Sequence, residues 1–138
     1  MTEISRLTET EILDNIEELQ YDDEFVKLRN HFLVRATERL NTKLMRVLLD
    51  KGANPNINGW GNIESLLHNL AHKYGSERNL KGEKILEAAK LLLDYGADPN
   101  IAGCNNLAPI QVCHSIMADE FENLLISYGA DIEGNIPV

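Results

Sequence analysis

One short phrase occurs three times in the chain, and it constrains the fold more than any other feature. The copies read LLDKGANPNI at Leu48–Ile57, LLDYGADPNI at Leu92–Ile101 and LISYGADI at Leu125–Ile132. Their glycines are 44 and 33 residues apart, which is a period of 33 with 11 residues added once. A fixed period near this length indicates an array of repeated supersecondary units.

Each copy has the chemistry of a helix that ends at a tight turn. Leucines such as Leu48 and Leu92 end an apolar helical run, and a glycine follows at Gly52, Gly96 and Gly129. Glycine accepts the left-handed conformation that ends many helices, so positive φ angles are expected at these three residues. The Asn or Asp that comes next in each copy starts a turn, and proline holds the chain extended in two copies.

The segments before these glycines resemble the inner-helix opening T-P-L-H-x-A-A of the ankyrin-repeat family. The copies are Ala108–His114, Ser65–Ala71 and, most weakly, His31–Thr37. The opening ends 15 residues before the glycine in the first and third copies but 25 residues before it in the second, so ten residues are inserted there. The resemblance covers roughly residues 30–133. It implies an all-α fold, an α-solenoid of helix-turn-helix repeats with short hairpin-like fingers.

We expect residues 1–138 to form a single domain, in which an acidic cap at 1–24 precedes repeats at 25–57, 58–101 and 102–138. Thr8 and Glu11 form a capping box that begins the cap helix, whose one apolar face can cover the repeats. Little or no β-sheet is expected. The spacing of apolar residues predicts helices near 8–20, 30–40 (or from near Asp23), 42–50, 65–73, 83–94, 108–116 and 119–127.

The ten inserted residues lie at about Lys73–Gly82 and read KYGSERNLKG. Their glycines, serine and asparagine are typical of a loop, so we expect a loop between two helices. Loops carry binding residues more often than their share of the chain. A tolerated loop without a role is the alternative, because surface loops lengthen at a low cost in free energy.

The formal charge of −9 is unevenly distributed along the chain. Residues 1–24 carry −8, residues 25–51 carry +5 and residues 52–138 carry −6. Nucleic acid requires a basic footprint and is therefore disfavoured as a partner. The acidic ends would steer a basic protein partner toward the chain. Ordinary surface charge that keeps a small protein soluble is the alternative explanation of the same acids, and the simpler one.

The sequence has no apolar run near the roughly 20 residues that a membrane helix needs. Its acidic N-terminus lacks the apolar region of a secretory signal. The cysteines, Cys104 and Cys113, have a spacing that suggests neither a disulfide framework nor a metal site. We therefore expect a cytoplasmic monomer with reduced thiols and no membrane association.

The resemblance places a binding surface on the fingers and on the concave side of the inner helices. Trp60 lies between two glycines at a finger tip. It either anchors a partner, as tryptophan often does in interfaces, or folds back onto the next helix. The matching inner-helix positions are Glu38, Arg39, His72, Lys73, Ser115 and Ile116, and the finger positions are Trp60, Asn62, Cys104 and Asn105.

His68 and His72 are four residues apart on an expected helix, a spacing that can place two metal ligands on one face. No glutamate follows the first histidine, no third ligand is evident, and His68 matches a structural histidine of the ankyrin motif. The sequence has neither a phosphate-binding glycine loop nor a nucleophile elbow. Cys113 replaces an alanine of the motif and is interpreted as a small buried apolar residue. We therefore expect no enzyme activity, no cofactor and no bound metal.

The sequence favours a module that binds another protein through its concave face and fingers. The expected partner has a basic surface, and in one version of this function the module inhibits it. A bacterial immunity protein that neutralises a cognate basic toxin is the alternative, because small acidic proteins of one domain serve in that role. A metal- or thiol-dependent enzyme that uses His68, His72 or Cys104 is a remote alternative.

Overall fold

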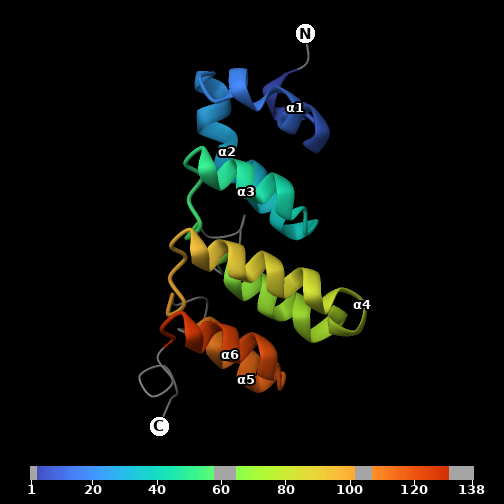
Figure 1. The fold of residues 1–138 in the computed structure, drawn as a ribbon, viewed down its shortest axis with the longest axis vertical. Helices are drawn as coiled ribbons and strands as arrows, with labels where there is room; N and C mark the ends of the chain where they lie inside the picture. The colour runs from blue at the N-terminus through green and yellow to red at the C-terminus, as the bar shows by residue number, and fades with distance from the viewer. Residues whose placement is uncertain (1–2, 58–64, 102–106, 131–138) are drawn as a thin grey trace. The chain divides into compact units, whose positions relative to one another are not determined.

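The computed structural model describes residues 3–57, 65–101 and 107–130 (Figure 1). These ranges contain six α-helices and one 3₁₀ turn, with an isolated β-bridge residue at Ser65 and no longer strand. The chain divides into two compact units, Met1–Asn54 and Pro55–Val138. None of the helices in the described ranges is both long and apolar enough to cross a membrane.

The first unit contains η1 (Ile4–Arg6), α1 (Glu9–Leu19), α2 (Asp23–Glu38) and α3 (Thr42–Asp50). Helix α3 packs against α2 and α1, and η1 packs against α2. The apolar faces of these helices meet in one core. Its largest fully buried side chains are Ile12, Phe25, Phe32, Leu33, Leu44, Met45 and Leu48.

Side-chain caps decide where the first helices begin. The predicted capping box is confirmed, because the Glu11 amide donates to Thr8 Oγ1 at 3.1 Å and the Thr8 amide donates to Glu11 Oε1 at 3.0 Å. Asp22 Oδ1 accepts from the amides of the next turn, so α2 begins at Asp23. Of the two predicted starts of this helix, the later one near residue 30 is wrong. Asn30 lies inside α2, where its side-chain oxygen accepts the Asn54 N–H at 2.7 Å.

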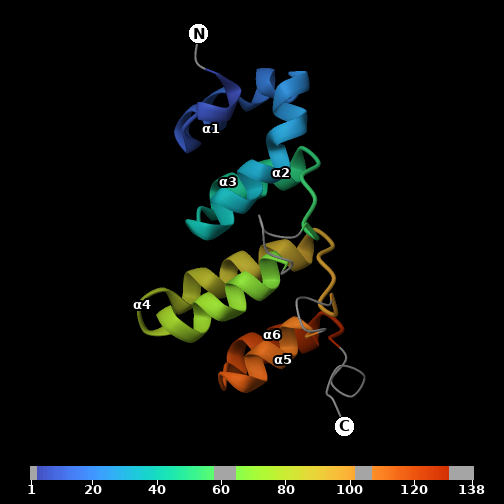
Figure 2. The ribbon, with the colours of Figure 1, turned by 180° about the vertical axis from the view of Figure 1, so that it is seen from behind.

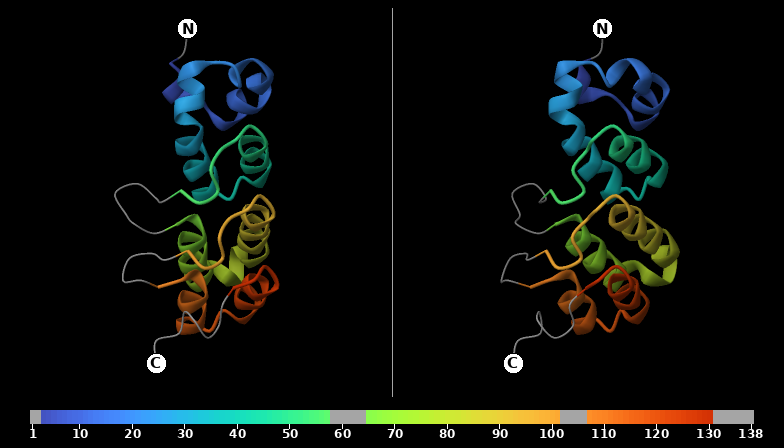
Figure 3. Two further views of the ribbon diagram at one scale, coloured as in Figure 1. Left: turned by 90° about the vertical axis from the view of Figure 1, so that its left-hand side faces the viewer. Right: turned by 60° about the vertical axis from the view of Figure 1, so that its left-hand side comes forward.

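The second unit contains α4 (Leu66–Asp94), α5 (Pro109–Ser115) and α6 (Asp119–Ser127). Residues of α4 are helical throughout, but the element folds back into two antiparallel legs (Figures 1 and 2). A Cβ at Gly82 would lie 3.5 Å from the Tyr74 ring. A straight helix would separate these two residues by about 12 Å along its axis, so the close approach agrees with a reversal of the chain between them. Helices α5 and α6 pair with each other and pack against α4 (Figure 3).

The prediction of a loop at 73–82 is wrong, because these residues continue the helical legs of α4. Glu77 pairs with Lys73 at 3.1 Å and with Lys81 at 3.6 Å, both at the four-residue spacing that supports a helix. The hydrogen bond from Lys73 and the two positive charges lower the pKa of the Glu77 carboxyl. Gly75 and Gly82, which suggested a loop, do not take left-handed φ angles.

The repeated phrase ends its helices as predicted. Gly52, Gly96 and Gly129 have φ angles of 99°, 96° and 96°. The amide after each glycine closes the turn on a carbonyl five residues back, for example Ala97 N to Leu92 O at 2.9 Å. This is the bond made when a left-handed glycine ends a helix. The same local chemistry therefore ends α3, α4 and α6.

Candidate functional site

His68 joins two helix starts in the second unit and is almost fully buried. Its Nδ1 lies 2.7 Å from Ser65 Oγ, and its Nε2 lies 2.6 Å from the Leu107 carbonyl oxygen. A carbonyl accepts only, so Nε2 carries the proton and Nδ1 accepts from the serine hydroxyl. Both ring nitrogens are thereby engaged, which confirms the structural interpretation of His68 and leaves no lone pair for a metal.

Two candidate residues lie one turn after His68 on the first leg of α4. His72 is exposed, and Lys73 is half-buried and held by its ion pair with Glu77. Ser115 and Ile116 lie at the end of α5, where Ser115 Oγ donates to the Val112 carbonyl at 2.8 Å. All four belong to the second unit.

Close packing brings these two pairs of candidates together. Ile116 lies directly over Gly75, because a Cβ at Gly75 would be only 3.0 Å from Ile116 Cδ1. Gly75 is within one helical turn of His72, and α4 packs against α5. This contact joins the stretch of α4 that carries His72 and Lys73 to the end of α5 that carries Ser115 and Ile116, and we call these four residues the α4–α5 patch.

Arg78, which sequence reasoning did not single out, supports this patch from the inserted segment. Its guanidinium donates to the Ile116 carbonyl at 2.7 Å and to the Met117 carbonyl at 3.1 Å. It also lies 5.1 Å from the centre of the Tyr74 ring, whose edge meets Phe121. A base inside an insertion was the available signal, but only the folded-back helix shows which carbonyls it reaches.

Glu38 and Arg39 are exposed at the end of α2 in the first unit. Arg39 Nη1 lies 4.0 Å from Glu9 Oε1, and Glu9 Oε2 accepts from the Asn41 side chain at 3.1 Å. The Arg39 side chain is largely exposed, so this ion pair contributes little to stability. These two candidates are available at the surface, but they do not belong to the α4–α5 patch.

The four finger candidates, Trp60, Asn62, Cys104 and Asn105, lie outside the described residues. Their part in binding stays a prediction. The alternatives for Trp60, an anchor or a side chain folded onto the next helix, stay open with it.

Cys113 is fully buried in α5. Burial raises the pKa of its thiol to about 12, and the nearby Glu122 carboxylate adds to the rise. A thiol of this pKa is not a nucleophile near neutral pH, so Cys113 is the small buried apolar residue that was predicted. In the part of the chain that the structure describes, no three His, Cys, Asp or Glu residues are arranged to hold a metal ion.

Comparison with known proteins gives a clear likeness to solved structures. No family model matches the sequence, and no curated protein matches it. Among solved structures, an ankyrin repeat domain from Acinetobacter baumannii AYE is similar, with 28% sequence identity and a TM-score of 0.59. The match covers 72% of this chain and 47% of that one, so the aligned region is about half of the Acinetobacter chain.

Proposed function

Because the chain has an ankyrin-repeat fold, we propose that it is a module that binds another protein and has no catalytic activity. Ankyrin repeats are binding scaffolds, and a scaffold needs a defined exposed surface. The α4–α5 patch supports the proposal, because α4 and α5 meet there through Ile116, which packs on Gly75 and whose carbonyl accepts from Arg78. This junction of two helices is the observation on which the proposal rests.

The state of His68 and of Cys113 argues against a catalytic role for these two side chains. Both nitrogens of His68 are engaged in structural hydrogen bonds. The raised pKa of Cys113, about 12, keeps its thiol protonated. Neither residue can therefore act as a metal ligand or a nucleophile without partial unfolding.

We propose further that the partner has a basic surface and that the fingers take part in binding. From Leu91 to Val138 the sequence has seven acidic residues and no Lys or Arg. Such a field accelerates association with a basic protein and is weakened by salt. Trp60 is proposed as the finger anchor, since tryptophan is enriched among residues that dominate interface energies.

The test begins with isolation of the partner on the tagged full-length chain, identification by mass spectrometry and purification. Binding of the purified partner is then measured by surface plasmon resonance. The double variant His72→Ala/Lys73→Ala is expected to bind at least about ten-fold more weakly, because it removes two side chains of the patch. The matched control is Glu83→Ala/Lys84→Ala, two exposed residues on the second leg of α4. Equal effects of the two double variants would contradict the assignment of the patch.

The finger and the charge are tested in the same measurement. Trp60→Ala is expected to cost about 2 kcal/mol, mainly through faster dissociation. Neutralising Asp119, Glu120 and Glu122 should slow association and reduce its dependence on salt. An association rate that is independent of ionic strength would contradict a basic partner.

A more specific version of the proposed function is that the chain inhibits the protein it binds. If the chain inhibits its partner, as an immunity protein inhibits a toxin, the partner's activity should fall in proportion to the complex formed, with a one-to-one end point. Full activity of the saturated complex would instead indicate an adaptor.

A further inference from the structure

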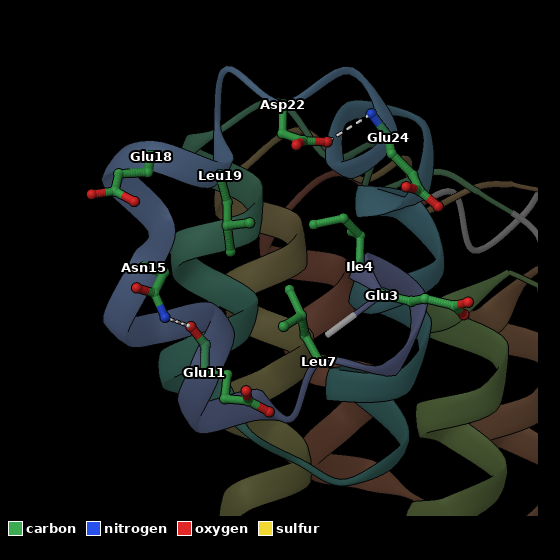
Figure 4. Close-up of a pocket in the computed structure, with 9 residues that line it drawn as sticks. All are labelled: Glu3, Ile4, Leu7, Glu11, Asn15, Glu18, Leu19, Asp22 and Glu24. Carbon is green, nitrogen blue, oxygen red and sulfur yellow. Dashed lines mark hydrogen bonds between the residues drawn. The ribbon is translucent and has the colours of Figure 1, made fainter. Parts of the chain in front are cut away.

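A pocket of about 600 Å³ opens in the first unit between η1, α1 and the start of α2 (Figure 4). Its size is within the range of ligand-binding cavities. None of its lining residues belongs to the α4–α5 patch. The lining consists of Glu3, Ile4, Leu7, Glu11, Asn15, Glu18, Leu19, Asp22 and Glu24.

The lining combines an apolar centre with an acidic rim. The side chains of Ile4, Leu7 and Leu19 point toward one another at the centre of the pocket in Figure 4. Of the other six lining residues, five are acidic and one is Asn15, and none is basic. An apolar floor ringed by carboxylates fits a ligand that is apolar along its length and positively charged at its end.

Two of the carboxylates remain available to a ligand. Glu11 and Asp22 already cap helices, and Glu3 pairs with Arg6 at 3.6 Å. Within the described part of the chain, Glu18 and Glu24 have no hydrogen bond and no ion pair with another side chain. They lie on opposite sides of the apolar centre (Figure 4).

Two bases of the first unit contact groups that do not line the pocket, and a third, Arg35, reaches the lining only at the backbone of Leu7. Arg29 donates to the Lys51 carbonyl at 3.0 Å, and Arg39 approaches Glu9. Arg35 lies over the Phe32 ring and donates to the backbone carbonyl of Leu7 at 3.4 Å. No base lines the pocket, and residues 1–24 carry nine acids and one base, so the rim has an excess of negative charge.

We propose that this pocket binds a basic, amphipathic segment of a partner protein. A Lys or Arg side chain of the segment lays its alkyl stem on Ile4, Leu7 and Leu19 and its charge reaches Glu18 or Glu24. A neighbouring apolar side chain of the segment fills the rest of the floor. An anion is repelled by the rim, and a neutral apolar ligand would desolvate carboxylates without compensation.

This inference goes beyond the function proposed above, because it assigns a second surface on a different unit. It can fail while the α4–α5 patch binds its partner. It can also hold if the patch has no role in binding.

The probe is an acetylated and amidated peptide of alternating leucine and arginine, titrated into the full-length chain and followed by methyl NMR. The methyl signals of Ile4, Leu7 and Leu19 are expected to shift and saturate. Glu18→Gln/Glu24→Gln should weaken binding at least about ten-fold in 150 mM salt, where only short-range charge effects persist. The control Asp14→Asn/Glu17→Gln makes the same charge change at exposed residues of α1 outside the pocket, and should weaken binding less than about two-fold.

Four outcomes would overturn the proposal. The first is the absence of saturable binding at millimolar peptide, and the second is an equal effect of both double variants, which would indicate a general field. The third is equal binding of a peptide with serine in place of leucine, which would exclude the apolar floor. The fourth is self-association that Glu18→Gln/Glu24→Gln abolishes in sedimentation, because the occupant would then be a second copy of the chain. His72→Ala/Lys73→Ala should leave peptide binding unchanged, which keeps the two surfaces distinguishable.

Discussion

The turn between α2 and α3 and the turn between α5 and α6 have the same backbone but different support. Leu40 and Met117 occupy the same place in them, with left-handed φ angles of 56° and 55°. In each turn the next amide reaches back to a buried residue, from Asn41 to the Ala36 carbonyl at 2.9 Å and from Ala118 to the Cys113 carbonyl at 2.8 Å. A non-glycine residue at such an angle costs about 1–2 kcal/mol, so each turn needs compensation.

The first turn is compensated by its own residues. The Leu40 side chain is only 5% exposed, so its burial offsets the backbone strain. Asn41 Oδ1 accepts the Leu44 N–H at 3.1 Å and caps α3. Its amide group also donates to Glu9, which ties the turn to α1.

The second turn has neither form of local support. Met117 is 78% exposed, and Ala118 has no side-chain oxygen with which to cap α6. Arg78 of the inserted segment supplies the missing contacts by binding the carbonyls of Ile116 and Met117. The insertion therefore replaces local support with a contact from 38 residues away, and it fixes a residue of the α4–α5 patch.

Among changes to the two turns, Leu40→Gly should have the largest effect on stability. Glycine relieves the strain, but the loss of a buried leucine costs more, so the first unit should lose about 2–3 kcal/mol of unfolding free energy. Hydrogen exchange followed by mass spectrometry on peptides of α2 and α3 measures this loss. Unchanged protection there would mean that burial of Leu40 does not compensate the turn.

Removal of the Arg78 side chain should have the next largest effect. Arg78→Ala deletes two hydrogen bonds from a charged donor and should cost the second unit about 2 kcal/mol. Exchange in α5 and α6 should accelerate, while exchange in α2 and α3 stays the same. Arg46→Ala, at an exposed base of α3, is the control. Equal protection in both variants would mean that the second turn holds its shape without the insertion.

The contrast between the turns also shows what the sequence could predict. The repeated glycines, Pro109 and the Thr8 capping box act within a few residues, so the helix ends they set were predictable. The helical conformation of residues 73–82 was not predictable in this way. Glycine and serine favour a loop locally, while Glu77 and its two lysines favour a helix. Which of these local preferences prevails depends on packing against the ring of Tyr74, which the sequence does not display.

For the candidate site too, the sequence predicted what the repeat pattern sets and missed what long-range packing sets. The resemblance supplied His72, Lys73, Ser115 and Ile116, because repeat positions transfer from copy to copy. It did not supply Arg78, since the residue lies in an insertion that has no counterpart in the repeat pattern. The pocket in the first unit was also missed, because the three segments that line it meet only in the folded chain.

The third prediction concerns the pH dependence of stability. The carbonyl that closes the first turn belongs to Ala36, and the one that closes the second turn belongs to Cys113, which has a titratable thiol. Burial raises the thiol pKa from the ordinary 9.0 to about 12, so the folded state stays protonated while the unfolded state ionises. Stability contributed by the neutral thiol is complete below pH 9 and is lost as the pH rises toward 12. At pH 10 the loss should be about 1.4 kcal/mol relative to pH 7.5. Urea unfolding of the parent and of Cys113→Ala, both with reductant, measures it, and parallel pH profiles for the two proteins would exclude the effect.

The smallest expected effect has the opposite sign from the largest. Met117→Gly should stabilise the second unit by about 0.5 kcal/mol, because relief of the left-handed φ slightly exceeds the entropy that glycine adds to the unfolded chain. Little burial is lost, since the Met117 side chain is mostly exposed, and its carbonyl remains available to Arg78. Hydrogen exchange in α5 and α6 gives the size and sign of the change. A destabilisation as large as that of Leu40→Gly would show that the Met117 side chain stabilises the second turn. The distinction between a turn supported by its own residues and a turn supported by Arg78 would then be wrong.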